Sequence, residues 1–227
     1  MKKYIPLVLI GGGVLIIVLA IFVVMKSLKS GTANPTASSQ ATENVPELAQ
    51  AQWPVLSLTP TVDAKIPNSL GHLLDFKVQK INVPNATTMD YLLIYNTTDG
   101  GQQGVPGTIQ LTGADIDKNL LLGSESSGHY RFDDGVTQGT ITITFRDKSG
   151  KSVGKLSSDF HLQTGVIGLT SVDGKFSYNL TKLAKGIYFV TMPTFVQPAD
   201  SASYVVWQNG YGIFASDGKA HAGSVIQ

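Results

Sequence analysis

The hydrophobic and polar residues follow three successive patterns along the chain of 227 residues. Residues 4–25 are apolar and carry no formal charge, residues 26–52 are mainly polar, and residues 53–227 alternate repeatedly between apolar and polar positions. A continuous apolar stretch is typical of a membrane-spanning helix, a polar stretch without aromatic residues of a disordered linker, and alternation of β-strands. The pattern therefore predicts an anchor, a spacer and a β-rich body.

Residues 4–25 have the length and composition of a single transmembrane helix. At about 1.5 Å per residue such a helix is roughly 33 Å long, enough to cross a hydrocarbon core of about 30 Å. The alternative is a cleaved signal peptide, whose apolar core is usually shorter and ends at a small-residue cleavage site. Because Lys26 and Lys29 follow the apolar segment directly, we expect an uncleaved anchor that contacts the lipid bilayer.

The lysines on the two sides of this segment predict its orientation. Lys2, Lys3 and the terminal amino group precede it, and Lys26 and Lys29 follow it. Because the more positive side of a membrane helix remains in the cytoplasm, residues 1–3 are expected to be cytoplasmic and the C-terminal body extracytoplasmic. The chain is thus predicted to be a single-pass protein of the cell membrane.

Residues 26–52 separate the predicted anchor from the body. They are rich in serine and threonine and contain no aromatic residue. Such a composition cannot bury enough apolar surface to offset the entropy lost on ordering, so the spacer is expected to be disordered. The alternative is that residues 46–52 form a short helix that docks on the body, since their sequence has moderate helix propensity.

Alternating segments recur through the body. In residues 140–146 three apolar side chains face one way and threonines the other, whereas residues 91–95 are apolar on both faces, as expected of a central strand. Further strands are predicted at 74–78, 109–112, 160–162, 176–180, 187–191 and 204–207. Asp-Gly and Asn-Gly turns separate several of them, and Asn209-Gly210 is the strongest hairpin signal.

The spacing of these segments predicts an all-β fold. Residues 53–163 suffice for an immunoglobulin-like β-sandwich of about seven strands. Residues 164–227 contain about five more strands, which form either a second small β domain or an extension of the same sandwich. No segment of the body has a sustained helical period, so no long helix is expected there.

Two stretches of the body carry a resemblance to known proteins. They are MDYLLIYNTTDGGQQGVPGTIQLTG at residues 89–113 and LLLGSESSGHYRFDDGVTQGTITITFRD at residues 120–147. Residues 72–220, which include both, resemble uncharacterised membrane-anchored proteins of uncultivated small-genome bacteria, in which one N-terminal helix precedes an immunoglobulin- or fibronectin-like domain. The resemblance implies this fold and an extracytoplasmic location. It implies no activity and no functional residue.

Composition excludes several kinds of chemistry. Because the chain has no cysteine, it has no disulfide, no thiolate zinc site, no cysteine nucleophile and no lipobox. Its net charge is +1 and its body contains just two arginines, so it lacks the basic surface of a nucleic-acid-binding protein. The four histidines do not have the spacing of a zinc site. We therefore expect no cofactor and no nucleic-acid partner.

Asp115, Asp117 and Asn119 are weak candidates for calcium ligands. They occupy alternate positions, as the first ligands of a calcium loop do. However, Leu120 stands where such a loop has glycine, and Ser126 stands where it has a bidentate glutamate. The segment is therefore predicted to be a polar strand face, and the alternative is a calcium site completed by distant residues.

No nucleophile motif occurs in the context that it requires, so the protein is expected not to be an enzyme. Tyr95, Trp207 and Tyr211 are candidates for a sugar- or peptide-binding face, although Trp207 is expected to pack inside. The sequence predicts a non-catalytic binding or assembly module of the cell envelope, with an envelope protein or a glycan as partner. The alternatives are a structural subunit of a surface or secretion assembly that pairs through strand edges, and an envelope hydrolase with a non-local site.

Overall fold

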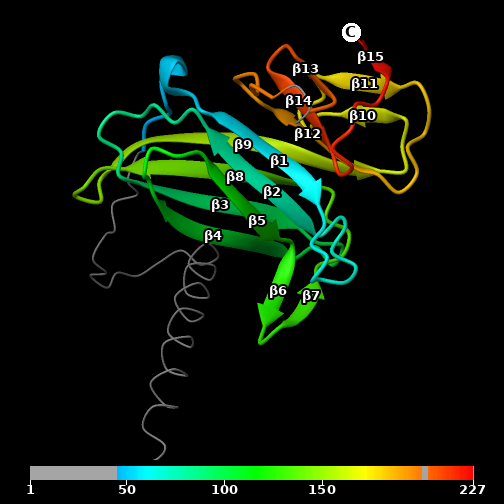
Figure 1. Cartoon of the computed structure of the whole chain (residues 1–227), viewed down its shortest axis with the longest axis horizontal. Coiled ribbons are helices and arrows are strands. Elements are labelled where there is room, and N and C mark those ends of the chain that lie inside the picture. Colours follow the sequence, from blue (N-terminus) through cyan, green and yellow to red (C-terminus); the bar gives the residue numbers. More distant parts are fainter. Residues whose placement is uncertain (1–44, 201–203, 227) are drawn as a thin grey trace, which may run out of the picture. The chain divides into compact units, whose positions relative to one another are not determined.

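The computed structural model describes residues 45–200 and 204–226, which form the expected all-β fold (Figure 1). In this part of the chain the one helical element is a 3-10 turn at Gln50–Gln52. None of its helical segments is long and apolar enough to cross a membrane. The predicted cytoplasmic residues 1–3 and the predicted transmembrane residues 4–25 lie outside the described residues.

The described strands lie in one large sheet and three small ones. The large sheet has the order β13-β14-β12-β9-β8-β3-β4, and all its neighbours are antiparallel. Its strands are β3 (Thr88–Asn96), β4 (Gln102–Gln110), β8 (Gln138–Arg146), β9 (Ser152–Thr164), β12 (Tyr188–Pro193), β13 (Val206–Gln208) and β14 (Tyr211–Ala215). The small sheets are β1 (Val55–Thr61), β2 (Leu73–Gln79) and β5 (Ile116–Leu121); β10 (Gly168–Thr170), β11 (Ser177–Leu180) and β15 (Gly223–Ile226); and the hairpin of β6 (Gly123–Ser126) and β7 (His129–Phe132).

The sheet β1-β2-β5 packs against one face of the large sheet, and the two sheets share a hydrophobic core. Alternation along each strand decides which side chains enter it. The inward residues of the large sheet include Met89, Leu93, Ile141, Ile143, Phe145 and Phe160, and those of the small sheet include Leu56, Leu58, Leu74, Phe76 and Val78. Two sheets packed face to face are consistent with the predicted β-sandwich.

The C-terminal third of the chain extends the large sheet. β12 pairs with the end of β9, and β14 pairs with β12. Successive residues of β12 face two different hydrophobic cores. Val190 and Met192 join the core between the large sheet and β1-β2-β5. Phe189 faces a second, smaller core, where it packs with Tyr178 and Leu180 of β11. The described residues belong to one compact unit. Within residues 164–226, β12, β13 and β14 thus continue the large sheet, whereas β10, β11 and β15 form a small sheet of their own.

The segment that enters the body was expected to be disordered, but its last residues are packed. Leu48 is buried, its backbone N–H donates to the carbonyl of Lys155 at 2.8 Å, and the N–H of Lys155 donates to the carbonyl of Pro46 at 2.9 Å. Gly154 provides the space, since a Cβ atom there would lie 2.5 Å from Leu48. The packed chain therefore begins before residue 53, and the rest of the predicted spacer lies outside the described residues.

The turn chemistry of the sequence is confirmed at the predicted hairpin. Asn209 and Gly210 have φ angles of 54° and 79° and join β13 to β14, as a type I′ turn requires. A second such turn, which no Asn-Gly or Asp-Gly pair marks in the sequence, lies at Ser127 and Gly128, with φ angles of 52° and 80°. It closes the β6–β7 hairpin, which projects from the sheets (Figure 1).

The outer face of the large sheet carries an ion pair that connects three strands. Nε of Arg146 in β8 donates to Asp90 of β3 at 2.5 Å, and the hydroxyl of Thr108 in β4 donates to the same carboxylate at 2.7 Å. Burial alone would raise the pKa of Asp90, but these two hydrogen bonds and the charge of Arg146 hold the pKa below its ordinary value. The ionised carboxylate therefore stabilises the folded state.

Replacing this carboxylate by Asp90→Asn is expected to reduce the free energy of unfolding at pH 7 by about 1 kcal/mol. A carboxyl group with a lowered pKa stabilises the fold above its unfolded pKa of about 4, and the stabilisation is lost as the pH falls through the folded pKa. The variant should consequently lose less stability than the native protein on acidification below about pH 4.

Urea denaturation at a series of pH values measures this difference. Asp159→Asn is the matched control, because Asp159 lies on the same face and accepts a hydrogen bond from Thr140. Parallel pH profiles for Asp90→Asn and the native protein would contradict the assignment.

Candidate functional site

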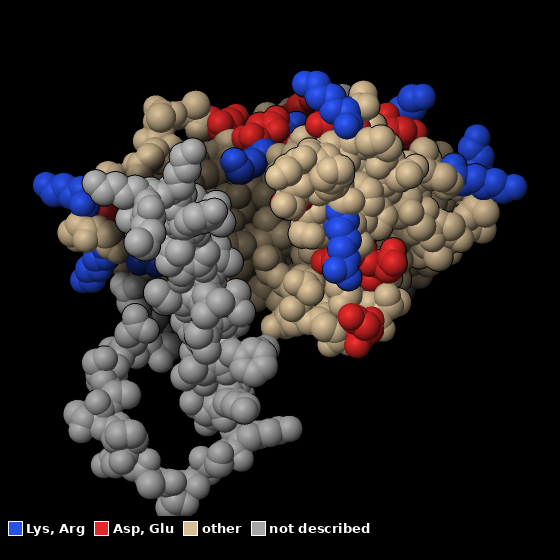
Figure 2. Space-filling model, turned by 90° about the horizontal axis from the view of Figure 1, so that it is seen from below, with Lys and Arg blue, Asp and Glu red and all other residues tan. Residues whose placement is uncertain are grey.

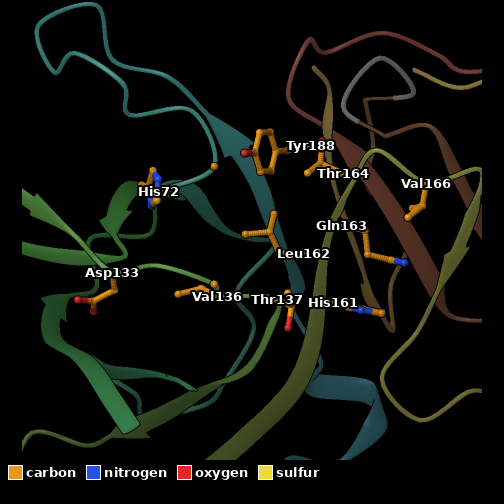
Figure 3. A pocket seen from close by; sticks show the side chains of 12 residues that line it. His72, Asp133, Val136, Thr137, His161, Leu162, Gln163, Thr164, Val166 and Tyr188 are labelled. Carbon is orange, nitrogen blue, oxygen red and sulfur yellow. The ribbon is translucent and has the colours of Figure 1, made fainter. Parts of the chain in front are cut away.

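A cavity of about 370 Å³ opens at one end of the two packed sheets (Figure 3). Four segments that are distant in sequence meet there: residues 71–72 before β2, residues 133–137 before β8, residues 161–166 at and just after the end of β9, and the first residue of β12. They meet because β8 and β9 are antiparallel, so the start of one lies beside the end of the other. Small-molecule sites commonly have volumes of about 300–1,000 Å³.

One wall of the cavity is formed by His72. Its ring stacks on Phe132, with centroids 4.6 Å apart and an angle of 18° between the planes. The Nδ1 atom of His72 is buried and has no hydrogen-bond partner among the described residues. A buried polar atom without a partner costs about 1–3 kcal/mol, and such atoms usually bind ordered water or a ligand. His72 therefore marks this cavity as the leading candidate site.

Tyr188 forms the opposite wall. Its side chain extends from β12 toward the part of the cavity where His72 lies (Figure 3). Gly71, with a φ of 86°, lets the chain pass directly against the ring, because a Cβ atom there would lie 2.6 Å from it. Leu162 and Val136 provide apolar surface between the two walls. Below, this site is called the His72–Tyr188 cavity.

Asp133 is the carboxylate of the His72–Tyr188 cavity, and it already has a partner. Its Oδ2 accepts a hydrogen bond from the hydroxyl of Tyr95 at 2.9 Å. Burial, followed by the hydrogen bond to Asp133, raises the pKa of Tyr95, so this phenol remains a donor. No lysine or arginine is found among the described residues that line the cavity. Asp133 is therefore the one carboxylate of the described lining, and no lysine or arginine lies beside it there.

The three aromatic residues predicted to form a binding face are not brought together. Tyr95 is 2% exposed and lies in the core. Trp207 is half-buried and donates Nε1–H to the carbonyl of Thr194 at 2.7 Å. The ring of Tyr211 stacks on that of Phe176, with centroids 5.2 Å apart, and its hydroxyl donates to Oδ2 of Asp173 at 2.6 Å. Burial and this hydrogen bond raise the pKa of Tyr211 to about 12. Each ring therefore has a packing role.

The calcium candidates also have partners from the protein. Asp115 accepts hydrogen bonds at 3.1 and 3.2 Å from residues at the end of β2, and Asn119 lies opposite Asp75 in the register of β2 and β5. The ammonium group of Lys77 lies 3.4 Å from Asp117 and 2.9 Å from Asp75. Within the described ranges no group of three or more His, Asp or Glu side chains could hold a metal ion.

The open edge of β4 is a second candidate surface, because the predicted assembly role would use such an edge. Backbone hydrogen bonds from Leu111 to Thr87 and from Thr97 to Gly101 lie at the two ends of the β3–β4 ladder. Since backbone groups of successive residues in a strand point to opposite sides, the odd-numbered residues of β4 bond to β3. The backbone groups of Gly104, Pro106 and Thr108 therefore face the open side. Proline has no N–H, so the middle of this edge lacks a donor. Edge prolines oppose pairing with another strand.

Charged side chains do not gather into a patch of one sign on the face shown in Figure 2. Basic and acidic side chains lie there singly or beside one another, separated by uncharged surface. Neither this face nor the lining of the His72–Tyr188 cavity is strongly charged. Recognition through the cavity would therefore depend on shape and neutral hydrogen bonds.

The principal residues of the His72–Tyr188 cavity were not found by sequence reasoning. His72 was one of four scattered histidines, and Tyr188 belonged to a predicted strand. The usable signal was weak: Gly71-His72 directly precedes β2, and Asp133-Asp134-Gly135 directly follows β7, and loops at strand ends commonly carry binding residues. Comparisons of the chain with protein-family models, with curated proteins and with solved structures find no match.

Proposed function

We propose that this protein is a membrane-anchored, non-catalytic binding module of the cell envelope, and that the His72–Tyr188 cavity is its ligand site. The observation that carries the proposal is the buried Nδ1 of His72, which lacks a partner in the wall of an open cavity of ligand size. The apolar residues 4–25 and the polar residues that follow them support an anchor and a tether that hold the body outside the cytoplasm.

We also propose that the body is immunoglobulin-like. If β1, β2 and β5 are taken as strands A, B and E, and β3, β8 and β9 as C, F and G, the orders A-B-E and C-F-G agree with those of an immunoglobulin constant-type sandwich. β4 is then an added strand beside C, and β12 to β14 continue the sheet beyond G. This assignment supports the resemblance to membrane-anchored proteins of small-genome bacteria.

The side chains of the cavity support binding rather than catalysis. Asp133 is bonded to Tyr95, and Nδ1 of His161 donates to the carbonyl of Thr170 at 2.8 Å. Neither group is arranged to activate a nucleophile, which requires a base directly beside it. The proline in the middle of the β4 edge favours the cavity over strand pairing as the site of recognition.

The absence of cysteine permits a direct test with single-cysteine variants. Val166 lines the cavity and is 39% exposed, whereas Val172 lies outside it and is 40% exposed. With a membrane-impermeant maleimide, both Val166→Cys and Val172→Cys should react in intact cells, because exposed thiols react readily. In native membranes a ligand bound in the cavity should make Val166→Cys react more slowly than Val172→Cys. Purification of the full-length protein should remove the ligand and abolish this difference in labelling rate.

Labelling only after permeabilisation would overturn the extracytoplasmic placement. If the ratio of the labelling rates of Val166→Cys and Val172→Cys is the same in native membranes and in purified protein, the cavity is not a ligand site.

A further inference from the structure

We infer that the ligand of the His72–Tyr188 cavity is an uncharged saccharide unit. The inference rests on the proposed binding function and adds the chemical class of the ligand. It follows from the charge of the lining, the hydrogen-bonding groups that lack partners, and the apolar surface between them.

The charge of the lining argues against an ionic ligand. An anion would enter a cavity whose described lining contains no lysine or arginine. A cation would find one carboxylate, Asp133, which already accepts a hydrogen bond from Tyr95 at 2.9 Å. Transfer of an ion from water without a matching charge is strongly unfavourable. A neutral ligand avoids this cost.

Three polar groups of the lining have no hydrogen-bond partner among the described residues. Nδ1 of His72 and the hydroxyl groups of Thr137 and Tyr188 make no hydrogen bond to the described residues. A hydroxyl group both donates and accepts, and an imidazole offers one nitrogen of each kind when it is neutral. A sugar carries several hydroxyl groups that also donate and accept, so it can pair with the hydroxyl groups of Thr137 and Tyr188 without requiring a fixed proton on either of them.

The backbone around the cavity argues against a peptide. The N–H of Leu162 donates to the carbonyl of Thr137 at 2.6 Å, so β9 and the segment before β8 have already paired there. A peptide that adds to a sheet needs unpaired backbone groups. In their place the cavity offers Leu162, Val136 and the ring of Tyr188, on which the C–H faces of a sugar ring can pack.

The test uses purified full-length protein carrying Val166→Cys, in a detergent without a sugar headgroup. The neutral probes are chitotriose and cellotriose, and the charged probes are the trimers of galacturonic acid and of glucosamine. At millimolar concentration a neutral trimer should slow maleimide labelling of Val166→Cys by about threefold or more and leave Val172→Cys unchanged. Adding Tyr188→Phe or Thr137→Val should weaken protection about three- to tenfold, as expected for one lost hydrogen bond.

Tyr130→Phe, on the exposed β7, is the matched control for the loss of a tyrosine hydroxyl and should leave protection intact. Equal or better protection by a charged trimer would overturn the neutral class. No protection by any trimer would overturn the saccharide class. Both results leave the proposed binding function to its own test, because that test compares native membranes with purified protein and uses no added probe.

Discussion

Phe76→Ala is expected to lower the free energy of unfolding by about 4 kcal/mol and the melting temperature by about 8–16 °C. Phe76 is fully buried in β2, and its ring lies 5.3 Å from that of Tyr91 in β3. The side chain therefore fills the space between the two sheets. Truncation loses both the transfer free energy of the ring and its contacts with the lining of the space left behind.

Urea denaturation and thermal melting of the full-length protein measure this loss. Tyr130→Ala serves as the control, because it also removes an aromatic ring but from a position that is 40% exposed on the β6–β7 hairpin. The control should change stability by less than about 1 kcal/mol. Similar losses for the two variants would show that Phe76 does not join the sheets as described.

Gly139→Ala is expected to cost about 2–3 kcal/mol, although it adds a single methyl group. Gly139 lies in β8, where a Cβ atom would collide with the carbonyl oxygen of Ile94 and lie 2.7 Å from the ring of Phe160. The carbonyl belongs to the backbone of the neighbouring strand and cannot rotate away. The methyl group can be accommodated only if the sheet or the buried ring moves.

Gly104→Ala is a matched control in the same sheet. Gly104 lies in β4, and the nearest atom to its added Cβ would be a methyl group of Leu92 at 3.6 Å, an ordinary contact. Its stability should change by less than about 1 kcal/mol, since alanine also reduces the entropy of the unfolded chain. A loss for Gly139→Ala no larger than for Gly104→Ala, measured by urea denaturation, would contradict the packing around β8.

The strands that could be predicted are those whose two faces differ. Residues 140–146 alternate between apolar and threonine side chains, and they form most of β8 with the apolar set inside. The turns at Asp-Gly and Asn-Gly were predictable because glycine or asparagine occupies the positions of positive φ. β1 was not predicted, since it is buried on nearly every position and contains Pro60. The β6–β7 hairpin was missed because almost all of its residues are exposed.

The ordering of residues 45–52 was predicted only as the alternative, a short helix over residues 46–52 docked on the body, and disorder was expected instead. Their composition is polar, but Leu48 and the partly buried Trp53 pack on the main core, and the N–H of the Trp53 indole donates to the carbonyl of Leu48 at 2.9 Å. One apolar residue is enough because Gly154 leaves a matching recess in β9. Composition averaged over a whole segment cannot reveal such a pairwise fit.

The His72–Tyr188 cavity could not be predicted as a motif. Its residues come from four segments, which together span the chain from Gly71 to Tyr188, more than half of the described residues. What brings them together is the order of the strands, which depends on pairing between distant residues. Local patterns predict which segments are strands, but they do not contain that order.

The contact of residues 46–48 with β9 has a mechanical consequence. Any tension applied to the chain before these residues reaches the body first at Lys155, through two backbone hydrogen bonds, the 3.2 Å ion pair between Lys155 and Glu47, and the buried side chain of Leu48. β9 is the longest strand and lies in the interior of the large sheet. A pull is thus spread over neighbouring strands before it acts on β1, whose detachment would open the main core.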